Sequence, residues 1–403
     1  MPPALLRIFL PTAPLTRDDK WMIALLWAVG MGLGWAQGEA SALLPFTRRD
    51  LGVTEGGMSL ILALARLAAF GAVLLGALAD RIGRRRPLIA ALGLLILANG
   101  ASALAPTAVF YGLAQAFARI GGAALSALGV VAMAEGVSPP VRAYAISFFG
   151  AATSLGAGLS VLTLPLAEVT DLGWRLPHAL PLILLPALPL LWRRLPESPL
   201  HVQDLVRVPW RNLAGRRFYI LAVAGLLSSA FSAVGLAFTT ERLIGHLGFS
   251  SGQAILISVG GGTVGGLGFW IGGRLADSWG RRPTSILSLC LALAGGLALY
   301  TATEWWTLAA AAFVSAFGTF AYIPSLGAHR AELFPTTLRA AAGTATNYIA
   351  TVGSALGLLI GFVTIDAFGL LPTMALLGIG VAVAAVLTAF LPETLGQDLR
   401  RVE

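Results

Sequence analysis

The sequence has little charge. Only 11% of its 403 residues are Asp, Glu, Lys or Arg, whereas 57% are hydrophobic and the mean hydropathy is +0.82. A water-soluble domain needs a polar shell and cannot hide this much apolar surface inside itself. The composition therefore excludes an ordinary soluble protein and predicts that lipid surrounds most of the chain.

Lysine and cysteine are almost absent. Lys20 is the only lysine, so the net charge of +8 comes from arginines, which stand in short runs between apolar segments. A nucleic-acid-binding protein would carry its basic residues on one face of a folded domain. We therefore expect no nucleic-acid partner. The single cysteine, Cys290, has no partner for an intramolecular disulfide.

Several chemical signatures are also missing. The sequence contains no Gly-rich phosphate-binding loop, no cluster of metal-ligand residue types and no nucleophile paired with a histidine. We expect no cleaved signal peptide at the N-terminus, because a full-length apolar run starts at Trp21. We predict a protein that is not an enzyme and has no catalytic residues, no cofactor and no metal. Because no nucleotide-binding loop is present, any active transport by this protein must use an ion gradient.

Long apolar runs are abundant. About 20 apolar residues suffice for one membrane-spanning helix. The sequence predicts twelve such spans, near 21–45, 56–79, 87–105, 108–133, 142–167, 177–192, 217–241, 251–275, 284–302, 306–329, 340–365 and 370–391. The predicted fold is an all-α membrane protein with twelve transmembrane helices.

The basic residues give the orientation. Cytoplasmic loops carry an excess of Arg and Lys, and all but a few of the loop arginines lie on the side that holds both termini and the segment 193–217. The opposite side has only Arg48, Arg49, Arg175 and Arg242. We expect both termini to be cytoplasmic in a multi-pass protein of the inner (plasma) membrane.

The two halves of the chain repeat each other. A shift of 197 positions relates Asp80 to Asp277, and the same shift relates Glu135 to Glu332. Two separate motifs with one shift indicate a duplicated six-span unit. We predict an N-terminal six-helix bundle (1–192), a cytoplasmic linker (193–216) and a C-terminal six-helix bundle (217–403) with a short cytoplasmic tail.

Several motifs carry a family resemblance over the whole chain. The segment 76–86 and its copy at 273–282 resemble the signature of the major facilitator superfamily, and 195–199 and 332–336 resemble its sugar and organic-ion branch of metabolite:proton symporters. The resemblance implies alternating access, with a solute site between the two bundles.

The chain departs from the family patterns at three places. Its seventh span lacks the paired glutamines of sugar porters, and 156–158 lacks the proline of drug–proton antiporters. Gln115 stands where this branch usually has an arginine, and Arg119 lies one turn further on. These departures argue against a hexose and make drug export less favoured.

Three ionisable residues lie well inside the predicted spans, where charge is costly and often functional. Arg66 and Arg119 are about 14 and 16 Å from the outer ends of their spans, and Glu39 is about 9 Å from the end of its own. We predict that Arg119, together with Arg66, binds an anionic group and that Glu39 carries the coupling proton. A permanent pair of Glu39 with Arg66, Arg119, Arg48 or Arg49 is the structural alternative.

Neutral polar residues complete the candidate solute site. Those in the first half are Gln115, on the face of Arg119, and Trp35. Those in the second half are Tyr322, Asn347 and Tyr348, which belong to polar stripes at helical spacing. Interhelical contact is the alternative role for such stripes.

The remaining candidates form a predicted cytoplasmic latch. A carboxylate at the C-terminal end of its own helix is locally unfavourable by about 0.3–1 kcal/mol, so Asp80 and Asp277 need compensating partners from nearby arginines or from the other half. A static anchor is the alternative to a latch that opens in one transport state. The proposed latch residues are Asp80, Arg84, Glu135, Arg142, Asp277, Arg281, Glu332 and Arg339.

The sequence therefore favours a monomeric secondary transporter that couples protons to the symport of a small organic solute, such as a carboxylate. The alternatives are a facilitator or exporter of an organic cation or sugar, and a transport-inactive solute sensor. Its predicted partners are the solute, protons and the lipid bilayer.

Overall fold

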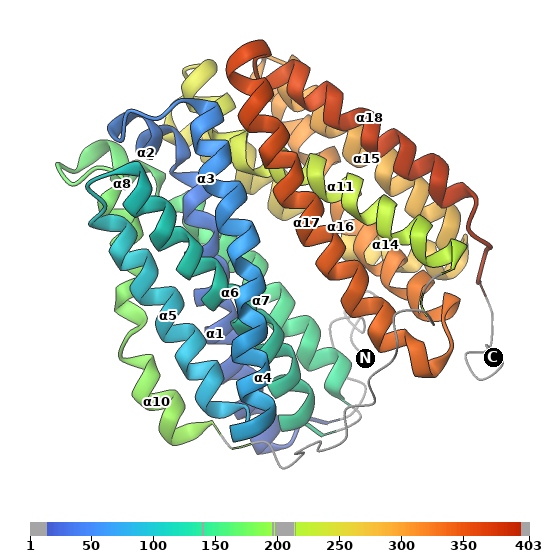
Figure 1. Cartoon of the computed structure of the whole chain (residues 1–403). Coiled ribbons are helices and arrows are strands. Elements are labelled where there is room, and N and C mark those ends of the chain that lie inside the picture. The colour runs from blue at the N-terminus through green and yellow to red at the C-terminus, as the bar shows by residue number, and fades with distance from the viewer. Residues whose placement is uncertain (1–13, 139–140, 196, 198–212, 214, 396–403) are drawn as a thin grey trace, which may run out of the picture. The chain divides into compact units, whose positions relative to one another are not determined.

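The computed structural model describes residues 14–138, 141–195, 197, 213 and 215–395, with the backbone alone at positions 80, 142, 143, 147, 336, 337 and 340. The described part is helical almost throughout and contains no strand (Figure 1). It divides into two compact units. Unit 1 comprises Met1–Glu39 and Ala68–Leu205, and unit 2 comprises Ala40–Leu67 and Val206–Glu403.

Helix α1 (Arg17–Ala42) starts in unit 1 and ends in unit 2. The other helices of unit 1 are η2 (Ala69–Gly71), α4 (Ala72–Ile82), α5 (Arg85–Ala103), α6 (Ala108–Gly136), α7 (Arg142–Leu162), α8 (Leu164–Val169), α9 (Arg175–Ala179), η4 (Leu180–Leu184) and α10 (Ala187–Arg194). Their shared core is apolar, and its fully buried side chains include Leu26, Leu92, Leu95 and Leu125.

Unit 2 takes α2 (Leu44–Asp50) and α3 (Glu55–Ala68) from the first half of the sequence. Its other helices are α11 (Arg216–Thr240), η6 (Glu241–His246), α12 (Ser251–Ile255), η7 (Leu256–Gly261), α13 (Gly262–Gly265), α14 (Gly268–Ser278), α15 (Arg281–Thr301), α16 (Trp305–Leu333), α17 (Thr336–Phe368) and α18 (Leu370–Ala389). Both η6 and η7 are π-helical turns.

Each predicted span overlaps one helix or a run of consecutive helices. Eleven helices or runs of helices in the described part are long and apolar enough to cross a membrane, and α1 is not among them. Four charged residues at its start (17–20), together with Gln37 and Glu39 near its end, lower the mean hydropathy of α1. The structure thus shows a many-helix membrane fold, and the count of twelve stays a prediction.

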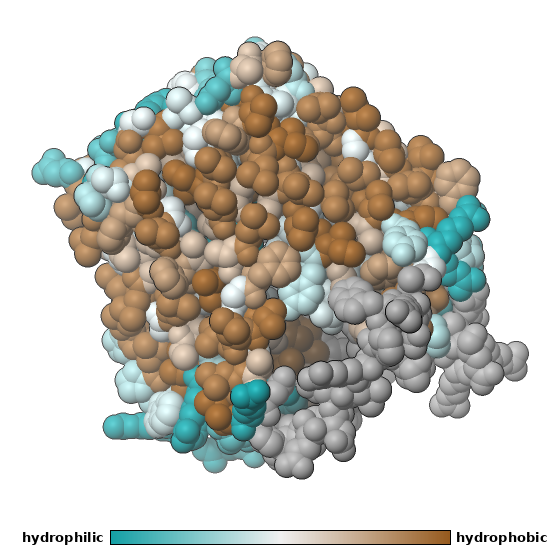
Figure 2. All heavy atoms as spheres, in the orientation of Figure 1, coloured by the Kyte–Doolittle hydropathy of each residue, from teal (hydrophilic) through white to brown (hydrophobic). Residues whose placement is uncertain are grey.

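The surface is apolar where a soluble protein would be polar. Large hydrophobic side chains such as Leu74, Val109 and Phe368 are at least two-thirds exposed. Figure 2 shows hydrophobic residues over most of the visible face, with hydrophilic ones gathered near its margins. Such a surface requires lipid as its solvent.

A turn that contains a glycine follows each of α4 and α14, and the two turns have the same arrangement. Gly83 has φ 93° and Gly280 has φ 123°, a region that favours glycine. The backbone N–H after each turn donates to a glutamate: Arg85 N to Glu197 Oε1 at 3.1 Å, and Arg282 N to Glu393 Oε2 at 3.0 Å. The two turns are 197 residues apart, as are the two motifs that contain them.

Candidate functional site

Glu39 lies inside unit 1 with its side chain fully buried. Its Oε2 is 3.4 Å from Nδ1 of His178, which is also fully buried. Neither Glu39 oxygen has a hydrogen-bond partner among the described residues. A buried carboxylate in this state is costly unless it is paired or holds a proton. The geometry therefore makes His178 the group with which Glu39 can exchange a proton.

His178 is enclosed by aromatic side chains from neighbouring helices. Its Nε2 is 3.4 Å from the hydroxyl oxygen of Tyr111 on α6, and both rings contact Trp174 edge to face. A neutral imidazole has one donor and one acceptor nitrogen. Because Glu39 and Tyr111 lie on opposite ring nitrogens, a change of tautomer can accompany proton transfer at Glu39.

Sequence reasoning missed His178 and Tyr111. His178 is in α9, far from Glu39 in the chain, and it lies at the very start of its predicted span. Its position one residue inside an apolar run was the only available signal. The alternatives for Glu39 had all been arginines. Of these, Arg48 pairs instead with Glu241 in unit 2.

Arg119 is a charged residue in the apolar helix α6, and its side chain is only partly buried. Its Nη2 donates to the carbonyl oxygen of Gln37 on α1 at 3.4 Å. Within the described residues, no carboxylate lies at ion-pair distance from this guanidinium. Gln37 precedes Glu39 by two residues, so α1 connects the arginine to the buried Glu39–His178 pair.

Two further candidates in unit 1 have different surroundings. Gln115 is buried, and its Nε2 donates to Ser102 Oγ on α5 at 3.0 Å, so it serves the contact between α5 and α6. Trp35 is partly buried, and its side chain lies near the carboxylate of Glu39 on the same helix without the geometry of a full hydrogen bond. The last candidate of the first half, Arg66, is partly buried in α3 of unit 2.

One polar candidate of the second half, Asn347, contacts Arg330, which was not among the candidate residues. Arg330 Nη1 donates to Thr346 Oγ1 at 2.8 Å and to Asn347 Oδ1 at 3.1 Å. Tyr322 lies two turns earlier on the same helix, α16, and its buried hydroxyl has no partner among the described residues. Tyr348 is 40% exposed.

The predicted latch residues form ion pairs within each unit. Arg84 Nε is 3.7 Å from Glu135 Oε2, and Arg281 Nη2 is 3.0 Å from Glu332 Oε1 at the positions related by the 197 shift. Arg281 also binds Asp277, one of the partners considered from the sequence.

The other latch residues are less completely described. Arg339 Nε donates to the carbonyl oxygen of Ala331 at 2.7 Å. The side chains of Asp80 and Arg142 lie outside the described residues. Whether these charges open and close between the two halves stays a prediction.

Comparison with known proteins assigns the chain. The family model described as Major Facilitator Superfamily matches residues 21–272 and 223–400. The chain belongs to this superfamily of transporters. It is therefore a multi-pass membrane transporter, and the family resemblance inferred from its motifs is confirmed.

The individual proteins that resemble this chain share less than a third of its residues. A Haemophilus influenzae protein named for metabolite transport is 28% identical over 94% of this chain and 98% of its own. A citrate–proton symporter of Klebsiella pneumoniae is 27% identical over 56% of this chain and 55% of its own. A bacterial homologue of the human lysosomal transporter Spinster is 14% identical and has a TM-score of 0.78 over 93% of this chain and 97% of its own, which shows a shared fold.

Proposed function

We propose that this transporter couples protons to the symport of a small organic anion, with Arg119 as the anion-binding group. The observation that carries the proposal is the state of Arg119, which is partly exposed within an apolar helix and has no carboxylate partner in the described part of the chain. An arginine stays charged in proteins and binds carboxylates through two parallel hydrogen bonds. A carboxylate on the solute would supply the missing negative charge.

The buried pair of Glu39 and His178 supports proton coupling. It is the pair in unit 1 that can take up a proton and hold it away from water, and α1 connects it to Arg119 through Gln37. The citrate–proton symporter among the relatives is a precedent for this combination of solute and ion.

The architecture we propose is that of twelve spans in two six-helix repeats, present as a monomer in the inner membrane with both termini cytoplasmic. The recurrence of the glycine turns and of the Arg–Glu pairs after 197 residues supports the repeat. Segment 40–67 packs in unit 2 in this structure, so the repeat and the compact units are different divisions of the chain.

Direct binding tests the anion proposal. Purified protein in detergent is titrated with mono-, di- and tricarboxylates, and with sugars and amines for comparison. We expect Arg119→Ala to weaken carboxylate binding by at least about tenfold, since an ion-paired hydrogen bond in a protected site contributes about 1.5–3 kcal/mol. Arg119→Lys should recover part of it.

A matched control is Arg193→Gln, which removes an exposed positive charge at the end of α10. It should leave carboxylate affinity unchanged. If Arg119→Ala binds a carboxylate as tightly as the wild-type protein does, or if only sugars or amines bind, the anion proposal is wrong.

A further inference from the structure

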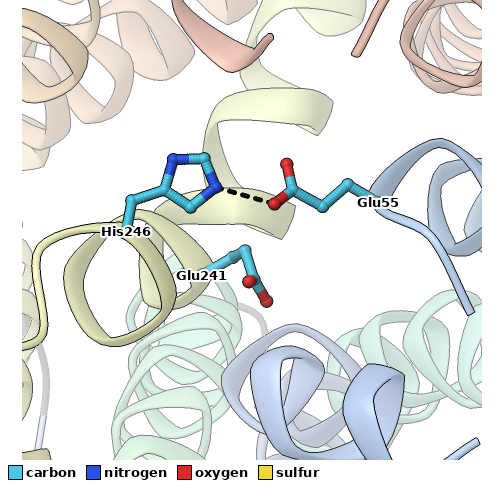
Figure 3. Close-up of side chains that lie close together, drawn as sticks. All are labelled: Glu55, Glu241 and His246. Atoms are coloured by element: carbon cyan, nitrogen blue, oxygen red, sulfur yellow. Dashed lines mark hydrogen bonds and ion pairs between the residues drawn. The ribbon is translucent and has the colours of Figure 1, made fainter. Parts of the chain in front are cut away.

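We propose that Glu55, Glu241 and His246 form a binding site for a divalent transition metal such as Zn²⁺, at the end of unit 2 where α3 begins. One ligand atom from each residue lies within 4.8 Å of the others (Figure 3). The set offers one imidazole nitrogen and two carboxylates, a mixture that suits Zn²⁺ better than Mg²⁺ or Ca²⁺, which prefer oxygen alone.

The π-helical turn brings two of these residues together. Glu241 and His246 are five positions apart, and in an α-helix they would point about 140° away from each other. In η6 the backbone N–H groups instead donate to the carbonyl oxygen five residues earlier, as the N–H of Leu247 does to the carbonyl oxygen of Arg242 at 3.1 Å. Such turns are rare and frequent at functional sites.

Glu55 approaches from a distant part of the sequence. It is the first residue of α3, and its Oε1 is 2.7 Å from Nε2 of His246. Two atoms bound to one tetrahedral Zn²⁺ lie about 3.4 Å apart. Small side-chain rotations would therefore turn the present cluster into a coordination sphere, with water in the remaining position.

The burial of the three side chains is graded. His246 is 32% exposed, Glu55 is 16% exposed and Glu241 is fully buried. Oε2 of Glu241 has no hydrogen-bond partner in the described part of the chain. A buried carboxylate oxygen without a partner is costly, and a metal ion bound by Glu241 would offset part of this cost.

Arg48 now occupies part of the place that a metal would need. Its Nη2 is 2.6 Å from Glu241 Oε1 and 3.8 Å from Glu55 Oε1. An arginine guanidinium keeps its positive charge in proteins. The guanidinium is therefore a competitor, and the metal must displace it or bind beside it.

The consequence for transport rests on the proposed function and orientation. In that orientation the cluster faces outside the cell. A metal bound there would fasten α3 to η6, two segments that the sequence places in different halves, and would slow any transport cycle that separates them.

Zinc binding is tested first, without any transport assay. The affinity of purified protein for Zn²⁺ is measured by competition with a chromophoric chelator, and thermal unfolding is followed with Zn²⁺, Mg²⁺ or Ca²⁺. We expect Zn²⁺ alone to raise the midpoint by several degrees, because a ligand that binds the folded state stabilises it. His246→Ala and Glu55→Gln should each weaken zinc binding by about tenfold or more.

Two further variants make the test specific. Glu304→Gln, an exposed carboxylate just before α16, is the matched control and should bind Zn²⁺ like the wild-type protein. Arg48→Gln should bind Zn²⁺ about tenfold more tightly, because a competing positive charge is gone. The proposal is overturned if Zn²⁺ does not stabilise the wild-type protein, if His246→Ala binds it equally well, or if Arg48→Gln does not bind it more tightly.

Uptake into proteoliposomes is a separate measurement. Zn²⁺ added on the outside should inhibit uptake by the wild-type protein and not by His246→Ala. Absence of uptake by the wild-type protein without zinc would count against the proposed transport function, whereas unchanged uptake with zinc bound would count against the fastening of α3 to η6.

Discussion

At the scale of single residues, His178 has a polar group near each of its ring nitrogens. A histidine that served only to pack the core would not need both. Glu39 lies at Nδ1 and Tyr111 at Nε2, both at 3.4 Å. These distances exceed those of strong hydrogen bonds. A small movement would therefore let a proton pass between these three groups. At the present distances, no strong hydrogen bond holds the proton on one of them.

We expect Glu39→Gln and His178→Gln to share one transport phenotype. The amide in Glu39→Gln would mimic the protonated carboxyl, and the amide in His178→Gln would remove the tautomer change, so solute binding and exchange should persist while pH-driven accumulation is lost. Reconstituted uptake with and without an imposed proton gradient measures the two activities. Full proton-driven accumulation by either variant would show that the pair is a structural contact. Tyr111→Phe is the milder comparison, because it removes only the hydroxyl.

At the scale of elements, Glu393 secures the turn between α14 and α15. Its carboxylate accepts backbone N–H groups of Arg281, Arg282, Thr394 and Leu395 at 2.9–3.0 Å. Burial raises the pKa of Glu393, but these four hydrogen bonds outweigh it and hold the pKa below the ordinary value of 4.5. The charged form is therefore the one that stabilises this turn.

Glu393→Gln should destabilise the folded protein by about 1 kcal/mol at neutral pH, because one amide oxygen replaces two acceptor oxygens. A group with a lowered pKa in the folded state contributes fully above its unfolded pKa and loses its contribution as the pH falls through the folded one. The difference between the wild-type protein and the variant should therefore shrink below pH 4.5.

Thermal unfolding in detergent from pH 7 to pH 3 measures this difference, with exposed Glu304→Gln as the control. A difference that grows towards acid pH would contradict the assigned role of the Glu393 carboxylate.

Much of the element structure could be predicted because lipid imposes a simple rule, namely about 20 apolar residues for each crossing. The repeat of the motifs that contain Gly83 and Gly280 could also be predicted, whereas the turns at these two glycines came from the structure. The cluster of Glu55, Glu241 and His246 could not be predicted, because Glu55 and Glu241 are far apart in the sequence and only the π-helical turn brings Glu241 and His246 together. Likewise, only the three-dimensional fold brings His178 to Glu39.

At the scale of the whole molecule, the arginine asymmetry predicts where the ends of the chain lie. Reporter fusions at Glu403 and within the linker 193–216 should both report the cytoplasm, because basic loops stay on that side. Fusions after Arg49 and after Arg175 should report the opposite side. A signal from outside at Glu403 or in the linker would rule out twelve spans with both ends cytoplasmic. The fusion after Arg49 tests whether α1 crosses the membrane.

The placement of segment 40–67 in unit 2 has a consequence for synthesis. Thr54 binds Asp366 across 312 residues, and Ser59 binds the carbonyl of Leu358 across 299. At about 5–20 residues per second, the ribosome needs roughly 15–60 s to make the chain between such partners. Helix α3 is therefore made well before α17 (Thr336–Phe368), and its polar contacts with that helix can form only once residue 366 has been translated.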